Sequence, residues 1–510
     1  RVQARTQSDR WLLQERVDQS KQILQIMAMA MQTSRRAELR VDEVDGLLKP
    51  ELKTGWEALK SAVSAGHAMF LRMSGESGKE ELRFLVKGFQ NFFAASCVAA
   101  EGAENLPELK ELLTDNWWQQ MLEMLGEAWP LNYVEIVQNR LGAFKSTSKD
   151  NFLHIAARSG HRPIFQLLHR FSESHKVALN QRGEDGMLPL HLAAQTGHTP
   201  LIDLMLKAGS AINAEDTGER LAVHIAMRNG HFQTAAFLNE RWLEQYGSAK
   251  TYERRSRKAE QLAQQMQMGL SEKDFLATAN ETFTELGFFS AKETVDKKRT
   301  VGALLAVFWI VASQYDQFVR GQAEGVRLSK SSWDHLQDWT RNTVCLTKSH
   351  SMVSAMLVYV AIMNVGKIKP FRAAFAPEED EPAEALARIL HRSPMLVPSF
   401  AKLEPEQQHV ILSALKADFN FGQFLQAENL PASLFTVRQI LAEGGAASGD
   451  ILGFFLFRIF AAMSGILGPK SLEGSIFMTE TNYKNFEVGL DTLQHLMEDG
   501  AVRVYDRFLV

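Results

Sequence analysis

Apolar and polar residues follow a helical spacing over most of the chain, and the strict alternation typical of half-buried β-strands is nearly absent. In residues 9–31, an apolar stripe on one face of a predicted helix is formed by Leu13, Val17, Leu24, Met27 and Met31. The pattern therefore predicts an all-α protein that begins with a helical region over residues 1–115.

The polar segment MSGESGKEE, residues 73–81, predicts a turn between two helices. Part of it is similar to a phosphate-binding loop, but the pattern GxxxxGK[ST] requires Gly where Met73 stands and Ser or Thr where Glu80 stands. That loop also follows a strand, whereas helices are expected before this segment. We interpret residues 73–81 as a plain turn.

The second half of the chain, residues 281–510, is dense in Phe, Leu, Ile and Ala and is divided by Gly and Pro into helices of ordinary length. Residues 301–312 are apolar but too short to span a membrane, which takes about 20 residues. Residues 451–467 carry Arg458 at their centre, at a cost of about 2.5–3.5 kcal/mol in a membrane. Buried helices of one large domain are therefore favoured, and membrane association is the less favoured alternative. The polar residues 243–280 predict a solvated linker helix.

Three similar strings occur in the middle of the chain: NFLHIAARSGH at 151–161, LPLHLAAQTGH at 188–198 and LAVHIAMRNGH at 221–231. Their first histidines are separated by 37 and 33 residues. Small alanines after each histidine allow close helix packing, and the following glycine can end a helix at positive φ.

This segment resembles the ankyrin repeat family, whose period is about 33 residues, over residues 150–238, or 116–242 with a degraded first unit and the last helix. The resemblance implies stacked helix pairs, histidines in structural hydrogen bonds, and flanking helices that cap the stack. The Thr-Pro pair typical of the family is absent. Its positions hold Asn151-Phe152, Leu188-Pro189 and Leu221-Ala222.

The resemblance also implies that a partner protein meets the turn tips and the inner helices. The corresponding turn positions are Lys149, Glu184, Asp185, Met187, Glu219 and Arg220. The corresponding inner-helix positions are Arg158, Ser159, Gln195, Thr196, Arg228 and Asn229. We expect a non-catalytic adaptor or scaffold. Two alternatives stay open: repeats that are purely structural, and an enzyme with its active site in residues 281–510.

Composition narrows these expectations. The 56 basic and 60 acidic residues give a net charge of −4, which argues against a polybasic nucleic-acid-binding protein. The two cysteines, Cys97 and Cys345, form no CxxC pair, which argues against a disulfide framework or a cysteine zinc site and favours an intracellular, cytoplasmic location. We predict no catalytic, cofactor-binding or metal-binding residues.

Overall fold

The computed structural model describes residues 7–76, 79–101, 115–125, 150–160, 162, 165, 179–247, 258–289, 294–342, 349–378, 381–417, 421–425, 430–443, 445, 448–496, 503–504 and 506. The structure is 72% helical with 3% strand, which confirms the all-α class. The chain forms two compact units, Arg1–Thr217 and Gly218–Val510. Their boundary falls inside the segment 116–242 that the sequence assigns to the repeats.

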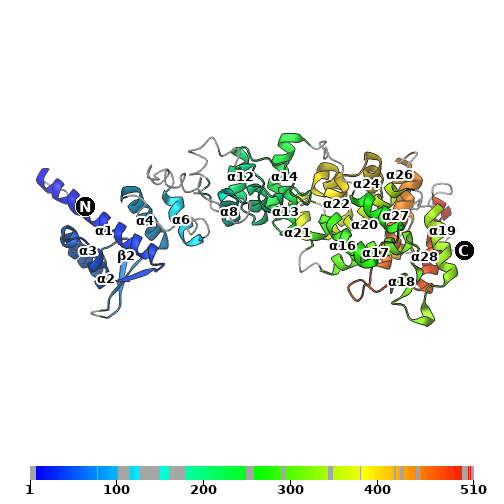
Figure 1. Cartoon of the computed structure of the whole chain (residues 1–510), viewed down its shortest axis with the longest axis horizontal. Coiled ribbons are helices and arrows are strands. Elements are labelled where there is room, and N and C mark those ends of the chain that lie inside the picture. The colour runs from blue at the N-terminus through cyan, green and yellow to red at the C-terminus, as the bar shows by residue number, and fades with distance from the viewer. Residues whose placement is uncertain are drawn as a thin grey trace. The chain divides into compact units, whose positions relative to one another are not determined.

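The first unit begins with the long helix α1, Gln7–Thr33 (Figure 1). Its apolar stripe is buried in the second half of the helix, where α1 packs against α3 and α4. Val17, in the first half, stays exposed. The elements that follow are β1 (Glu38–Arg40), α2 (Val41–Leu47), the 3-10 turn η1 (Pro50–Leu52), α3 (Lys53–Ser64), β2 (Leu71–Ser74), β3 (Glu81–Phe84), α4 (Lys87–Glu101) and α6 (Asn116–Leu125).

A small antiparallel sheet with strand order β1-β3-β2 corrects one sequence prediction. Residues 73–81 contain a turn, but β2 precedes it and β3 follows it, so the turn joins two strands and not two helices. Leu82 on β3 lies opposite Leu39 on β1 and Met73 on β2, and it is fully buried. The strands hold only three or four residues each, too few for their alternation to stand out in the sequence. A strand and not a helix also follows the turn, which does not match a phosphate-binding loop.

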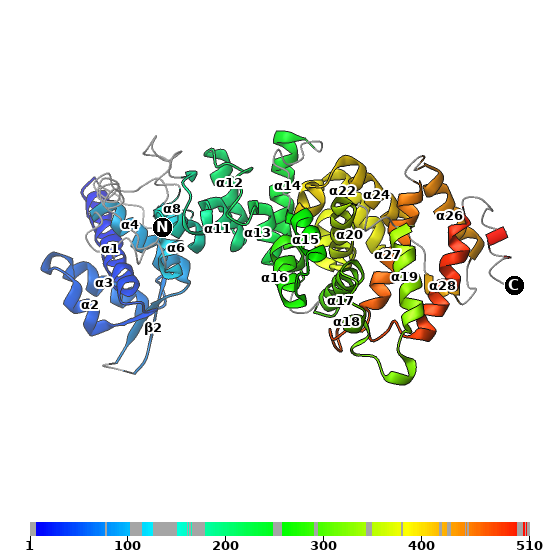
Figure 2. The same ribbon diagram turned by 45° about the vertical axis from the view of Figure 1, so that its right-hand side comes forward.

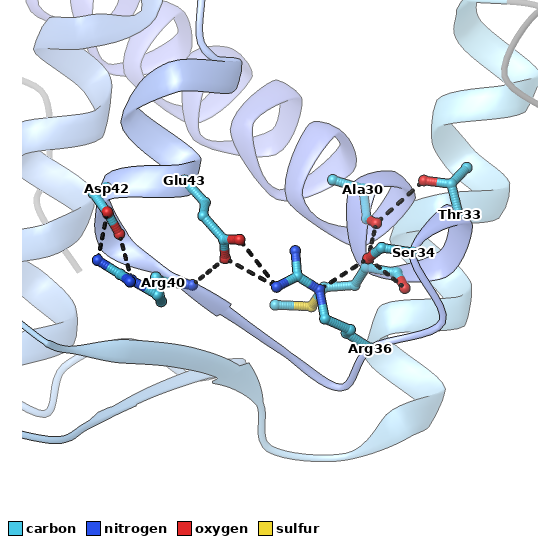
Figure 3. A network of polar contacts seen from close by, with 8 residues as sticks. Ala30, Thr33, Ser34, Arg36, Arg40, Asp42 and Glu43 are labelled. Atoms are coloured by element: carbon cyan, nitrogen blue, oxygen red, sulfur yellow. Dashed lines mark hydrogen bonds and ion pairs between the residues drawn. The ribbon is translucent and has the colours of Figure 1, made fainter.

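A polar network joins the end of α1 to the start of α2 (Figure 3). The Arg36 guanidinium donates to both carboxylate oxygens of Glu43, at 3.0 and 3.3 Å. The Arg40 backbone N–H donates to Glu43 at 2.8 Å, and the Arg40 side chain pairs with Asp42. The Arg40 N–H and then Arg36 lower the pKa of Glu43. The network fixes the chain where it leaves α1 and enters the sheet.

The repeat segment forms short helix pairs, as expected. In the first unit its described elements are α8 (Phe152–Ser159), the turn η2 (Glu184–Gly186), α11 (Pro189–Gln195) and α12 (Thr199–Lys207). The second unit continues with α13 (Ala222–Arg228) and α14 (Phe232–Tyr246). Gly160, Gly197 and Gly230 each adopt positive φ after an inner helix, as the sequence predicts. The degraded first unit lies outside the described residues from 126 to 149, and α6, at its start, packs against α4.

The rest of the second unit is a helical domain (Figure 2). Its elements are α15 (Lys258–Gln267), α16 (Glu272–Thr282), η3 (Thr284–Gly287), α17 (Thr294–Val311), α18 (Tyr315–Val319), η5 (Glu324–Val326), α19 (Lys330–Asn342), α20 (His350–Ile362), η6 (Val365–Lys367), α21 (Lys369–Phe375), α22 (Pro382–Arg392), η7 (Pro394–Leu396), α23 (Pro398–Ala401), α24 (Pro405–Lys416), α25 (Phe421–Leu425), α26 (Leu430–Glu443), α27 (Ser448–Ser464) and α28 (Glu480–Gln494).

The helices α17, α20 and α27 pack against one another and form the centre of this domain. The two apolar stretches noted in the sequence fall mainly on α17 and α27, and most of their residues are buried. Arg458 of α27 places its guanidinium over the Phe455 ring, 5.5 Å from the ring centroid. Among the described helices, none is both long and apolar enough to cross a membrane alone. The bent pair 350–367 and 369–375, at 85°, passes by length and composition only.

The predicted linker, residues 243–280, is not one solvated helix. It holds the end of α14, all of α15 and most of α16. Leu262, Ala263 and Met266 of α15 are buried, and α15 packs against α20. The many polar residues of this segment cover the outer side of α15, so composition alone concealed its buried face.

Candidate functional site

The repeat histidines are structural, as the resemblance implied. The Leu188 backbone N–H donates to Nδ1 of His191 at 2.9 Å, so the ring proton lies on Nε2, which faces the Ala214 carbonyl at 3.0 Å. His154 repeats the arrangement: its Nε2 lies 3.0 Å from the Met187 carbonyl. Burial lowers the pKa of His154, which favours the neutral ring that this bonding requires.

The histidine of the third repeat has a different kind of partner. Nδ1 of His224 accepts from the Leu221 N–H at 3.0 Å, as in the repeat before it. Its Nε2 lies 2.6 Å from the carbonyl of Met395, in the turn η7 of the helical domain. The helical domain therefore occupies the place where a fourth repeat would accept this hydrogen bond.

The missing Thr is replaced differently in the three repeats. Asn151 caps α8: its Oδ1 accepts from the N–H groups of Leu153 and His154, at 2.9 and 3.1 Å. The side chains of Leu188 and Leu221 carry no acceptor, and in these two repeats the leucine backbone N–H donates to Nδ1 of the histidine. The family geometry thus persists without the hydroxyl.

A buried carboxylate joins two of the predicted contact positions. Asp150 is 6% exposed. One of its oxygens accepts from the Glu184 backbone N–H at 2.9 Å, and the other pairs with the Arg158 guanidinium at 2.9 Å. A Cβ on Gly183 would lie 2.6 Å from Nε2 of His154, so this close approach requires glycine. The repeat pattern does not reveal the role of Asp150, because this residue lies just before the first repeated string.

The predicted contact residues of the first unit differ in how far their side chains are exposed to solvent. Lys149 lies outside the described residues. The exposed ones are Arg158, Glu184, Asp185 and Gln195, and the half-buried ones are Ser159, Met187 and Thr196. Thr217 stabilises the turn η2, because the Asp185 carbonyl accepts from both the N–H and the hydroxyl of Thr217, at 2.9 and 2.8 Å.

In the second unit, two of the predicted contact residues, Glu219 and Arg228, lie against the helical domain. The Glu219 carboxylate pairs with Lys402 at 2.7 Å and with Lys258 at 3.3 Å. The stem of Arg228 lies against Gly287, where an added Cβ would come within 3.0 Å of it. Arg220 is half-buried, while Arg228 and Asn229 are exposed. Glu219 thus attaches the last repeat turn to the helical domain.

Comparison with known families agrees with this geometry. Residues 148–245 match the model for ankyrin repeats (3 copies). This segment is an ankyrin repeat stack. Residues 270–510 match a family of unknown function (DUF6829). No curated protein matches the chain. Ankyrin repeats generally mediate protein–protein binding.

A polar cavity of about 190 Å³ lies where the last ankyrin turn meets the helical domain. Its lining includes Glu219, Lys258, Ser399, Lys402 and Gln407. Behind Ser399, the buried Glu285 accepts a hydrogen bond from the serine hydroxyl, and burial raises the pKa of Glu285 to about 7. In the described part of the chain, no group of three His, Cys, Asp or Glu side chains is placed to hold a metal ion.

Proposed function

We propose that the ankyrin repeats bind another protein and that the chain serves as a non-catalytic adaptor or scaffold. The proposed contact surface comprises turn tips and inner-helix ends of the first two repeats. It is formed by Arg158, Ser159, Glu184, Asp185, Met187, Gln195 and Thr196.

The observation that best supports this proposal is the position of Asp150. A buried carboxylate holds the Arg158 head group and the backbone at Glu184 at once. Two exposed positions are therefore fixed before any partner arrives. A surface that is already ordered loses less conformational entropy on binding, which favours affinity.

The third repeat has a different role in this proposal. Glu219 is paired with two lysines of the helical domain, and His224 is bonded to Met395. These contacts join the repeats to the helical domain, so the first two repeats remain for a partner. Arg220, Arg228 and Asn229 stay secondary members of the proposed contact surface.

The same contacts favour one alternative, in which the ankyrin repeats only hold the helical domain in place. A pull-down from native lysate distinguishes partner binding by the repeats from this purely structural role. The test variant carries Glu184→Lys and Gln195→Lys, both on exposed residues of the proposed surface. The matched control carries Glu240→Lys and Gln233→Lys, the same charge change on exposed residues of α14.

If the proposal holds, the test variant loses at least nine tenths of its specific partners, the control keeps them, and both retain the wild-type circular dichroism spectrum. Equal recovery of partners by wild type, test and control variants would show that the repeats are structural.

A further inference from the structure

The first unit carries an apolar groove between α1 and α4, called the α1–α4 groove below. It consists of two hollows. One, of about 400 Å³, is lined mainly by Phe70, Val86, Phe89, Phe92, Phe93 and Met124. The other, of about 420 Å³, is lined by Phe70 and Phe93 together with Val17, Leu24, Arg16 and Lys21 of α1. Phe70 and Phe93 line both hollows, so the two adjoin.

Large apolar side chains are exposed along this groove. Val17 is 54% exposed, Val86 60%, Phe92 52% and Met124 47%. Single exposed apolar residues are ordinary on a protein surface, but a cluster that also lines hollows marks a place where another molecule docks. None of these residues has a role in the ankyrin surface.

The shape of the groove fits a helix. The helix α1 has 27 residues and its packing partner α4 has 15, so α1 extends beyond α4. The stripe of α1 is buried at Met27 and Met31, and it opens into the groove at Val17. A helix lying beside the first half of α1 would continue the helix packing that α4 provides for the second half, over about 18 Å.

The charges of the groove select among possible helices. Arg16 and Lys21 line it, and among the described residues that line either hollow there is no Asp or Glu. Within the described part of the chain, Arg16 and Lys21 form no ion pair. Acidic residues beside the apolar face of a bound helix would therefore find cations at the rim.

We propose that the α1–α4 groove binds an amphipathic α-helix of another protein, with an apolar face flanked by Asp or Glu. A second copy of this chain fits less well, because pairing identical grooves would bring two sets of Arg16 and Lys21 together. A membrane surface fits less well because the apolar side chains line hollows, which accept protruding side chains.

The test uses the full chain and fluorescence anisotropy. The probe is a labelled synthetic helix of about 18 residues with leucine at helical spacing and glutamate on both flanks. A second probe has lysine in place of every glutamate. We expect the glutamate probe to bind at least tenfold more tightly than the lysine probe. Val17→Glu and Phe92→Glu should each weaken binding of the glutamate probe at least tenfold. The control Val488→Glu, at an equally exposed residue of α28, should not weaken it.

A charge reversal completes the test. Arg16→Glu together with Lys21→Glu should reverse the preference and favour the lysine probe. Equal binding of both probes, no binding of either, or an equal loss with Val488→Glu would overturn the proposal. If the glutamate probe does not bind, two other results would also overturn the proposal. One is a dimer in sedimentation that Phe92→Glu dissociates, and the other is binding to phosphatidylserine vesicles that Phe92→Glu abolishes.

Discussion

Nε2 of His224 lies 2.6 Å from the carbonyl oxygen of Met395, and both residues are buried. In the two preceding repeats the same histidine nitrogen faces a carbonyl of the next repeat segment, at Met187 and Ala214. The helical domain thus supplies the acceptor that a further repeat would supply. The last repeat of an ankyrin stack needs a cap that covers its apolar face, and here the helical domain serves as that cap.

Replacing His224 tests how much this closure contributes. We expect His224→Ala to lower the free energy of unfolding by about 2–4 kcal/mol, because it leaves the Leu221 N–H and the Met395 carbonyl buried without partners. His391→Ala, on an exposed histidine of α22, should change it by less than about 0.5 kcal/mol. Urea unfolding of both variants measures the difference. Equal stabilities would mean that the hydrogen bond does not secure the junction.

The buried Glu285 should make the stability depend on pH. Burial raises its pKa from 4.5 to about 7, so between these values the folded state binds more protons than the unfolded state. The contribution of Glu285 is therefore complete below about pH 4.5 and is lost as the pH rises through 7. The expected loss is on the order of 3 kcal/mol.

Glu285→Gln should remove this dependence, because the amide stays neutral. Its free energy of unfolding, relative to wild type, should rise between about pH 5 and 7 and level off above pH 7. Glu240→Gln, on an exposed residue of α14, should follow wild type throughout. Parallel pH profiles for wild type and Glu285→Gln would show that Glu285 is not buried as described.

The sequence was sufficient for the ankyrin repeats because their signal is local: a histidine, small residues and a glycine at fixed spacing. It was insufficient for the sheet, whose strands are short and pair across the turn at residues 73–81. It also could not reveal that His224 bonds to Met395, 171 positions further along the chain. Glu219 was expected to face a partner protein. The local sequence could not reveal that Glu219 pairs with Lys402, because Lys402 lies in the helical domain, far along the chain.

The crossing of α17 and α27 depends on two glycines. A Cβ on Gly302 would lie 3.0 Å from the Cα of Gly465, and a Cβ on Gly465 would lie 2.6 Å from the Arg299 carbonyl. We expect Gly465→Ala to lower the thermal unfolding midpoint by several degrees, equivalent to about 1–3 kcal/mol. Gly449→Ala, where a Cβ would meet nothing within 4 Å, should leave the midpoint unchanged or raise it. Similar effects of both substitutions would contradict the close crossing.

Asp150 should act on partner binding without touching the partner. Asp150→Ala frees the Arg158 head group and leaves the Glu184 N–H without its acceptor. We expect a loss of about 1–3 kcal/mol in stability and a weaker interaction with the partners captured by wild type. Hydrogen exchange at the Glu184 amide should accelerate. Unchanged exchange there would mean that Asp150 does not hold the turn.

The most direct test of the proposed function is site-specific photocrosslinking in native lysate. A photoreactive residue would be placed at Gln195, on the proposed surface, and in a separate variant at exposed Gln233 of α14. The proposal predicts a discrete crosslinked protein at Gln195 that is absent at Gln233 and is lost in the Glu184→Lys background. The same products at both positions, or none at Gln195, would contradict partner binding by the first two ankyrin repeats.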